Sequence, residues 1–292
     1  MKRLLCVALA LCVGLAGLSQ SGVGQDEPAP ETDRLGLERV DAFARAELAL
    51  WQTLHGVLLG MEACAVLECN DLRSGAAATM VGGGAGLGLA LWATGDGITP
   101  GRAHLLNSAT GWGLWNALAL GIVFEVDEPK AGAGLLMAGQ LGGLGAAAAL
   151  WPQFKPQAGD VGLINTGGIW SAVLTGMTLG ALEAQLDARE TFGLLWATTN
   201  LGGAAGAALA QAYPMGRGRV LVLNAGGLVG ALTGVGLALL IGGDDAPAPA
   251  YYGAGIAGAL AGRALSAWLP HDRVLQPAAN WAAGPPPGAP LH

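Results

Sequence analysis

Long apolar stretches separated by short polar ones fill the chain from residue 46 to residue 272. At about 20 to 25 residues, each stretch is long enough to cross a hydrocarbon core of about 30 Å as an α-helix. Strands of a membrane barrel would be about ten residues long, with apolar and polar side chains in alternation. Segments such as 220–223 and 237–241 are continuously apolar. The pattern therefore predicts helices.

A short motif, G-x-x-x-x-x-N, opens three of these stretches and marks an internal repeat. It runs over residues 101–107, 159–165 and 218–224, so it recurs after 58 and then 59 residues. A more divergent first copy runs from about Glu47 to Glu68, with His55 near the position of the Asn. We therefore predict an all-α fold, a polytopic membrane helix bundle of about eight glycine-rich helices in four tandem hairpin repeats.

The second stretch of each hairpin contains a G-x-x-x-G motif. These motifs are Gly84/Gly88, Gly139/Gly143, Gly202/Gly206 and Gly258/Gly262. In a membrane helix this spacing puts two glycines on one face, where a neighbouring backbone can approach closely. We predict that these residues pack helices together. Generic packing of small residues without a pairing role is the alternative, because the chain has 50 glycines.

The composition supports a membrane protein and excludes other classes. Charged residues make up 12% of the chain and apolar residues 52%, whereas a soluble domain is about 25% charged. The net charge is −7, and the 14 basic residues are scattered. Nucleic-acid binding needs clustered Lys and Arg, so nucleic acid is excluded as a partner.

The two ends of the chain differ from the apolar repeats. Lys2 and Arg3 precede an apolar segment, 4–18, and small residues follow at 22–24. This order is typical of a signal peptide over 1–24; an uncleaved first membrane helix is the alternative. Residues 25–45 form a charged lead-in, 46–272 the helical-hairpin repeat membrane domain, and 273–292 a flexible C-terminal tail with three consecutive prolines.

Charge separates the turns within hairpins from the connections between them. Turns within hairpins are acidic, as at Glu125, Asp127 and Glu128, whereas connections carry basic residues such as Arg102 and Lys155. An exported N-terminus would put the basic connections in the periplasm, against the positive-inside rule. We predict a cell envelope membrane, with the inner membrane slightly favoured because polytopic helical proteins generally reside there. The outer membrane is the alternative.

Amide side chains recur at one depth within the predicted spans. Asn107, Asn165 and Asn224 form this polar layer, with His55 near the same level, and Gln140 and Asn200 are candidate partners on the G-x-x-x-G helices. Buried amides need hydrogen-bond partners, so we expect bonds that fix the register of neighbouring helices. Lining an aqueous path is the alternative. The tryptophans lie mostly near predicted helix ends, which indicates interfacial belts.

Candidate chemistry is sparse in this sequence. Cys64 and Cys69 are a candidate disulfide if the helix ends between them, since a regular helix would hold the two side chains apart. The four histidines show no metal-ligand spacing. Glu47 and Glu62 do not by themselves define an acid–base site. The sequence predicts no catalytic residue, metal site or cofactor.

These observations lead to a modest functional hypothesis. We expect a non-enzymatic, exported integral membrane protein of the cell envelope with a structural or assembly role. A channel or transporter with an Asn-lined lumen is the alternative, and a soluble exported repeat protein is a third. The expected partners are the lipid bilayer and either a second copy or another envelope protein.

Overall fold

The computed structural model describes residues 40–243 and 246–269, and every regular element in this part of the chain is an α-helix. The helices are α2 (Ala42–Val66), α3 (Leu72–Ala93), α4 (Pro100–Val123), α5 (Pro129–Phe154), α6 (Ala158–Ala181), α7 (Ala188–Ala212), α8 (Arg217–Gly242) and α9 (Ala248–Trp268). The all-α prediction is thus confirmed for the described residues. The predicted signal peptide 1–24, most of the lead-in 25–45 and the tail 273–292 lie outside them.

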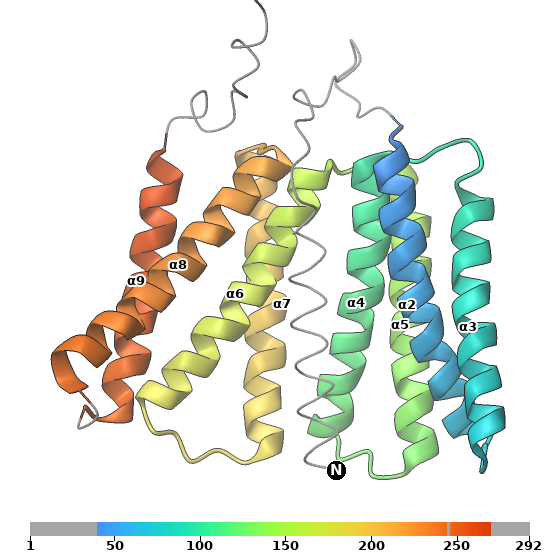
Figure 1. Ribbon diagram of the computed structural model, residues 1–292, viewed down its shortest axis with the longest axis horizontal. Coiled ribbons are helices and arrows are strands. Elements are labelled where there is room, and N and C mark those ends of the chain that lie inside the picture. Colours follow the sequence, from blue (N-terminus) through green and yellow to red (C-terminus); the bar gives the residue numbers. More distant parts are fainter. Residues whose placement is uncertain (1–39, 244–245, 270–292) are drawn as a thin grey trace, which may run out of the picture.

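Consecutive helices pack as antiparallel hairpins, α2 with α3, α4 with α5, α6 with α7 and α8 with α9. The first helices of the hairpins form one row, in which α2 contacts α4, α4 contacts α6, and α6 contacts α8. Each later second helix also packs on the first helix of the preceding hairpin: α5 on α2, α7 on α4 and α9 on α6. The hairpins therefore follow one another across the molecule in chain order (Figure 1).

Three of the hairpin turns share one backbone geometry. Glu68, Glu125 and Glu183 follow the ends of α2, α4 and α6 with φ of 56°, 52° and 49°. The N–H of the next residue donates to a carbonyl five positions back, at 2.9 Å from Cys69 and Val126 and at 3.0 Å from Ala184. This is a Schellman motif, in which glycine usually takes the left-handed position. The same turn thus reverses the chain after each of these helices.

Helix starts are set by polar caps and proline. Asp41, Asp71, Thr99 and Asp187 accept hydrogen bonds from backbone N–H groups in the first turns of α2, α3, α4 and α7, which satisfies donors that have no partner within a helix. Proline occupies the first position of α4 and α5, where its missing N–H costs nothing. Because α2 starts at Ala42, the helical part begins four residues before the predicted boundary at 46.

The outer surface of the bundle is apolar. Leu240 and Ile241 in α8 are 84% and 85% exposed, and Leu72 at the start of α3 is 89% exposed. By length and hydropathy, α3, α5 and α8 could each cross a membrane. The other five described helices have similar lengths, from 21 to 25 residues. Exposed apolar surface on this scale marks contact with lipid or another protein, which fits association with a membrane.

Candidate functional site

Within each hairpin the two backbones touch through glycine. A Cβ added at Gly143 of α5 would meet the carbonyl oxygen of Ala109 in α4. Facing pairs of glycines occur in all four hairpins: Gly56 with Gly82, Gly113 with Gly139, Gly167 with Gly202, and Gly230 with Gly258. Such close approach lets helices gain dispersion contacts and is the usual way in which small residues hold membrane helices together.

In α3 the predicted packing glycines are the wrong ones. A Cβ built on Gly84 or Gly88 would meet nothing within 4 Å, so both face away from α2. Gly82 and Gly86 make the close contacts instead, with Gly56 and the Gln52 carbonyl of α2. The segment 82–88 contains G-x-x-x-G in two registers. Only the face that α2 presents decides between them.

The motif of α7 is shifted by one helical turn relative to those of α5 and α9. Gly202 faces Gly167, two residues after Asn165, whereas Gly206 faces Leu163, two residues before it. In α5 and α9 the second glycine of each motif, Gly143 or Gly262, makes the contact two residues after the Asn. Gly202 is therefore the structural counterpart of Gly143 and Gly262.

Between hairpins the helices are joined by side chains, most clearly at Asn165. Its Oδ1 accepts a hydrogen bond from the Trp112 indole Nε1 at 2.8 Å, and its Nδ2 donates to Ser108 Oγ at 2.6 Å. The Trp112 ring lies over Gly168, where a Cβ would come within 2.5 Å of it. Asn165 of α6 is thus held by one donor and one acceptor of α4, and Gly168 leaves room for the indole ring.

The same arrangement joins α8 to α6. Trp170 Nε1 donates to Asn224 Oδ1 at 2.8 Å, and Asn224 Nδ2 donates to Thr166 Oγ1 at 2.9 Å. The Trp170 ring lies over Gly227, three residues after the Asn, as Gly168 is in α6. We call this unit the Trp–Asn clamp: an Asn of one hairpin bonded to the indole and hydroxyl groups of the preceding hairpin.

The clamp residues occupy the same positions in successive first helices, but α2 lacks the Asn and α8 lacks the hydroxyl and the indole. Asn107, Asn165 and Asn224 are each the eighth residue of their helix, and the eighth residue of α2 is Ala49. The hydroxyl and the indole follow the Asn by one and five residues in α4 and α6. In α8 these two positions hold Ala225 and Val229. The first hairpin thus lacks the Asn, and the last lacks the hydroxyl and the indole.

The first interface uses a different donor. Gln52 Nε2 donates to Asn107 Oδ1 at 3.1 Å and lies 3.5 Å from Thr110 Oγ1. Thr110 takes the place that Gly168 and Gly227 have in the other interfaces, because no indole ring covers it. The Nδ2 of Asn107 is buried without a hydrogen-bond partner among the described residues. Sequence analysis placed His55 at this level, but Gln52 is the residue that contacts the Asn.

Second helices contribute one buried position each to these interfaces. Gln140, Thr199 and Ala259 lie three residues before the equivalent glycines of α5, α7 and α9, and are 0%, 2% and 0% exposed. Thr199 Oγ1 accepts from Trp115 Nε1 of α4 at 3.0 Å. Nearby, Asn116 Oδ1 accepts from Trp196 Nε1 at 2.8 Å and Asn200 Nδ2 at 3.0 Å. Asn200 therefore pairs with Asn116 and not with the Asn layer.

Gln140 bridges two ionisable residues of α2. Its Oε1 lies 3.1 Å from Nδ1 of His55, and its Nε2 lies 2.8 Å from both carboxylate oxygens of Glu62. His55 is buried and Glu62 is half-buried. Gln140 therefore does not pair with an Asn of the layer either. It ties α5 to α2 through an imidazole and a carboxylate.

A second ionisable cluster joins all four first helices near their N-termini. Glu47 of α2 lies 3.3 Å from Nδ1 of His104 in α4 and 3.1 Å from a guanidinium nitrogen of Arg217 in α8. His104 Nε2 lies 3.4 Å from Asn165 Nδ2 of α6. Glu47 and His104 are buried, and a cavity of about 10 Å³, the size of one water molecule, is lined by His104 together with Gly162 and Arg217. The cluster is a tie between hairpins and a buried polar site.

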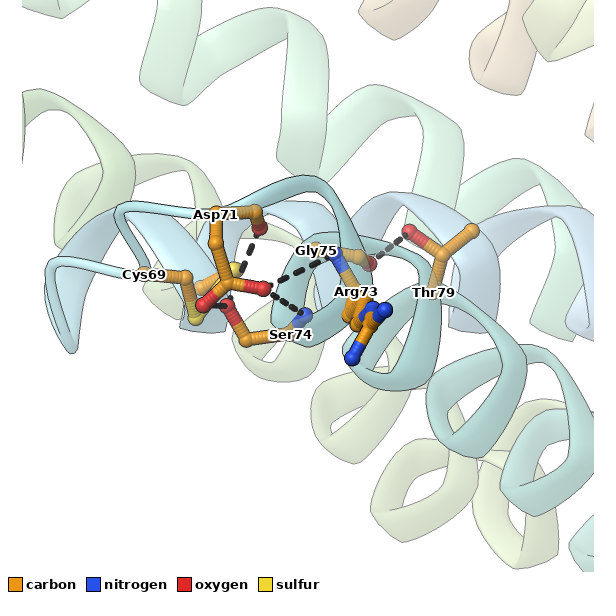
Figure 2. Close-up of a disulfide and its surroundings, with 7 residues drawn as sticks. Cys69, Asp71, Arg73, Ser74, Gly75 and Thr79 are labelled. Carbon is orange, nitrogen blue, oxygen red and sulfur yellow. Dashed lines mark hydrogen bonds between the residues drawn. A yellow bond between two sulfur atoms is a disulfide. The ribbon is translucent and has the colours of Figure 1, made fainter.

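Cys64 and Cys69 form a disulfide across the end of α2, with 5.1 Å between their Cα atoms. The helix ends at Val66, between the two cysteines. Just beyond, Asp71 accepts from the backbone N–H groups of Arg73 and Ser74 and from the Ser74 hydroxyl, each at 2.9 Å (Figure 2). The first hairpin turn is therefore fixed both covalently and by a helix cap.

Four tryptophans that sequence analysis assigned to interfacial belts lie inside the bundle instead. Trp112, Trp115, Trp170 and Trp196 each donate an indole N–H to a neighbouring helix. By contrast, Trp268 near the end of α9 is 90% exposed. The recurrence of Trp five residues after Asn, at 107–112 and 165–170, was the signal in the sequence that could have revealed the clamp.

Chemistry beyond helix contact finds little support among these residues. No group of three or more His, Cys, Asp or Glu side chains in the described part of the chain could hold a metal ion. Comparison with protein-family models, with curated proteins and with solved structures finds no match to this chain.

Proposed function

We propose that this protein is an exported integral membrane protein of the cell envelope with a structural or assembly role. In this proposal the bundle is built from four tandem hairpin repeats, and all of its helices lie in the bilayer. The main support for this role is the hydrogen bonding of the Asn layer. In Asn165 and Asn224 both the amide oxygen and the amide nitrogen bond to the preceding hairpin. Side chains committed in this way fix helix register and do not line a lumen.

Three features support the repeat proposal. The same Schellman turn follows α2, α4 and α6. A pair of facing glycines lies inside every hairpin. The Trp–Asn clamp joins the second hairpin to the third and the third to the fourth. A common ancestor hairpin accounts for all three, since nothing in helix packing requires such regular spacing of Asn and Trp.

Conductance measurements separate a scaffold from a channel. The full-length protein in planar bilayers should show no current above that of protein-free membranes. Asn165→Asp should leave it so, while lowering thermal stability, because a carboxylate cannot donate to Ser108. Stable ionic current whose selectivity shifts in Asn165→Asp would contradict the structural role and support a channel. Release of the protein into the soluble fraction by carbonate washing would contradict membrane integration.

We propose the inner membrane as the location, because polytopic helical proteins generally reside there, with the outer membrane as the alternative. Arg45, Arg102, Lys155, Arg217 and Arg219 lie at the connection end of the bundle, opposite the acidic hairpin turns. With a cleaved signal peptide this end would face the periplasm, which reverses the usual charge bias. Sucrose-gradient fractionation and the protease accessibility of a tag inserted after Gln185 test the location directly. A band in the outer-membrane fraction would contradict it.

A further inference from the structure

Buried ionisable residues gather in one of the three interfaces between hairpins. Glu47, His55 and His104 are the buried ionisable side chains of the described residues, and Glu62 is half-buried near them. All four lie where α2 faces α4 and α5. Between the third and fourth hairpins the charged side chain in contact is Arg263, which stacks on Trp170 at 5.1 Å.

Helix packing does not require these charges. The Trp–Asn clamp joins α6 to α8 with neutral side chains, and Thr199 fills in α7 the position that Gln140 fills in α5. Taking carboxylate and imidazole groups out of water costs several kcal/mol per ion unless they are well paired. Ionisable residues inside a membrane protein therefore commonly mark a functional site.

The polar groups of this interface form three levels along α2. Glu47 and His104 make the first level, Gln52 and Asn107 the second, and the His55–Gln140–Glu62 bridge the third. From Glu47 to Glu62 the helix rises by about 22 Å at 1.5 Å per residue, most of a hydrocarbon core of about 30 Å. The middle level holds the unpartnered, buried Nδ2 of Asn107. The second interface also has polar contacts, such as Trp115 with Thr199 and Trp196 with Asn116, but no buried carboxylate of its own helices lies among the described residues there.

We propose that the interface between the first two hairpins is a proton-binding site, in which Glu62 takes up the proton and Gln140 transmits its effect to the packing of α5 on α2. The proton comes from water at the hairpin-turn end and binds a carboxylate oxygen of Glu62. This proposal goes beyond the structural role and does not depend on it.

The bonding of Gln140 supplies the mechanism. Its Nε2 donates to both oxygens of Glu62 at 2.8 Å, an arrangement suited to an ionised carboxylate. Protonation turns one of these oxygens into a donor, so the Nε2 of Gln140 keeps only the other oxygen as an acceptor and its bonding to Glu62 is weakened. Because Gln140 is fully buried and its Oε1 is already engaged with His55, it cannot replace the contact that is lost. Proton uptake should therefore loosen α5 from α2.

Other charged groups near α2 are accounted for as follows. Helices packed on α2 contribute Arg73 from α3, Arg102 and His104 from α4, and Lys130 from α5; α2 and its turn add Arg45, Glu47, His55 and Glu68. Lys130 pairs with the exposed Glu68 at 2.7 Å, and Arg217 of α8 pairs with Glu47. Of all these groups, His55 is the one that shares Gln140 with Glu62. Glu68, Asp71, Glu125, Asp127 and Glu128 are other carboxyl groups at the same end, and Glu68, in the turn that follows α2, serves as the control.

The test uses full-length protein in liposomes. Cys6 and Cys12 are replaced so that they do not react, and two spin labels are attached to cysteines introduced at exposed positions. Labels at Leu67, just after α2, and Leu141 of α5 report on the packing of α5 on α2, and labels at Leu182 and Ile241 report on the third and fourth hairpins as a control. Acidification from about pH 8 to about pH 5, which covers perturbed carboxyl and imidazole groups, should broaden the distance distribution of the first pair alone. Infrared spectra should gain the carbonyl band of a protonated carboxyl group over the same range.

Variants assign the response to its residue. Glu62→Gln should abolish both the broadening and the infrared band, whereas Glu68→Gln should keep both. Gln140→Leu should keep the band and lose the pH dependence of the distance, which separates proton binding from its transmission. A distance that ignores pH, equal broadening in the control pair, or loss of the response in Glu68→Gln but not in Glu62→Gln would each overturn the proposal.

Discussion

The inside of a hairpin and the boundary between hairpins are held together in different ways. Inside, backbone lies on backbone: Gly230 faces Gly258, and neither brings a side chain to the contact. At the boundary, side chain bonds to side chain, as when Trp112 donates to Asn165. The contact inside a hairpin requires residues without a side chain. The contact between hairpins requires an indole and an amide at matching positions. The four hairpins therefore share one kind of internal contact, whereas the contacts between hairpins differ from one boundary to the next.

The boundaries between hairpins contain more polar and ionisable groups toward the N-terminus. The boundary between the third and fourth hairpins consists of one clamp, the stacking of Arg263 on Trp170, and apolar contacts such as Met177 with Gly255. The next boundary adds Trp196, Asn200 and Asn116, and the first adds buried carboxylate and imidazole groups. Function beyond holding the bundle together is therefore most expected at the first boundary.

Placing a side chain inside a hairpin should have the largest effect. Gly143→Leu would drive α5 away from the Ala109 carbonyl of α4, so we expect a loss of about 3 kcal/mol or more in unfolding free energy. Gly142→Leu is the matched control, because a Cβ there meets nothing within 4 Å. Thermal unfolding in detergent measures both. Equal tolerance of the two variants would show that backbone contact does not hold the hairpin.

Removing one clamp should cost less. Asn165→Ala and Trp112→Phe each delete the indole–amide hydrogen bond, and such bonds are worth about 0.6–2 kcal/mol in a membrane. The double variant should lose less than the sum of the single losses, because both changes remove the same bond. Asn224→Ala combined with Trp112→Phe should be additive, since these residues belong to different clamps. Additivity in the first pair would contradict the clamp.

Asn107 should be the least costly Asn of the layer to replace. Its Nδ2 has no hydrogen-bond partner among the described residues, and its Oδ1 accepts from Gln52 at the longer distance of 3.1 Å. We expect Asn107→Ala to lower the unfolding free energy by about 0.6 kcal/mol or less, the lower end of the membrane range. The comparison with Asn165→Ala is made in the same thermal assay. A larger loss at Asn107 would mean that the first boundary depends on this amide more than its contacts indicate.

The cap of α3 should have the smallest effect and should respond to pH. Hydrogen bonds from the backbone N–H and hydroxyl of Ser74, and then from the N–H of Arg73, lower the pKa of the Asp71 carboxyl group below its ordinary value. Its capping contribution is therefore present above the pKa of the unfolded chain and is lost as pH falls through the lower folded value. Asp71→Ala should increase hydrogen exchange in the first turn of α3 at neutral pH, and Asp71→Asn much less. Faster exchange at the clamps would contradict a purely local effect.

Sequence alone predicted the helices, the hairpin order and most of the packing glycines, because these follow from local apolar runs and regular spacing. It missed the partners of the Asn layer. Trp112 and Trp170 were assigned to the membrane interface, since a lone tryptophan in an apolar run gives no sign of which neighbour its N–H will meet. The register of α3 was also missed, because Gly82 and Gly84 are equivalent until α2 is in place. In each case the missing information was which residues of another helix the side chain or glycine would contact.

The clamp residues are missing at both ends of the described helices. A stack of similar hairpins could in principle go on growing, with the last unit of one copy receiving the first unit of the next, as head-to-tail contacts do when nothing closes them. Here Ala49 offers no amide to a preceding hairpin, and Ala225 and Val229 offer no hydroxyl or indole to a following one. Among the described residues the clamp therefore ends at these two edges, and copies of the protein that meet in a membrane cannot be joined to one another through it.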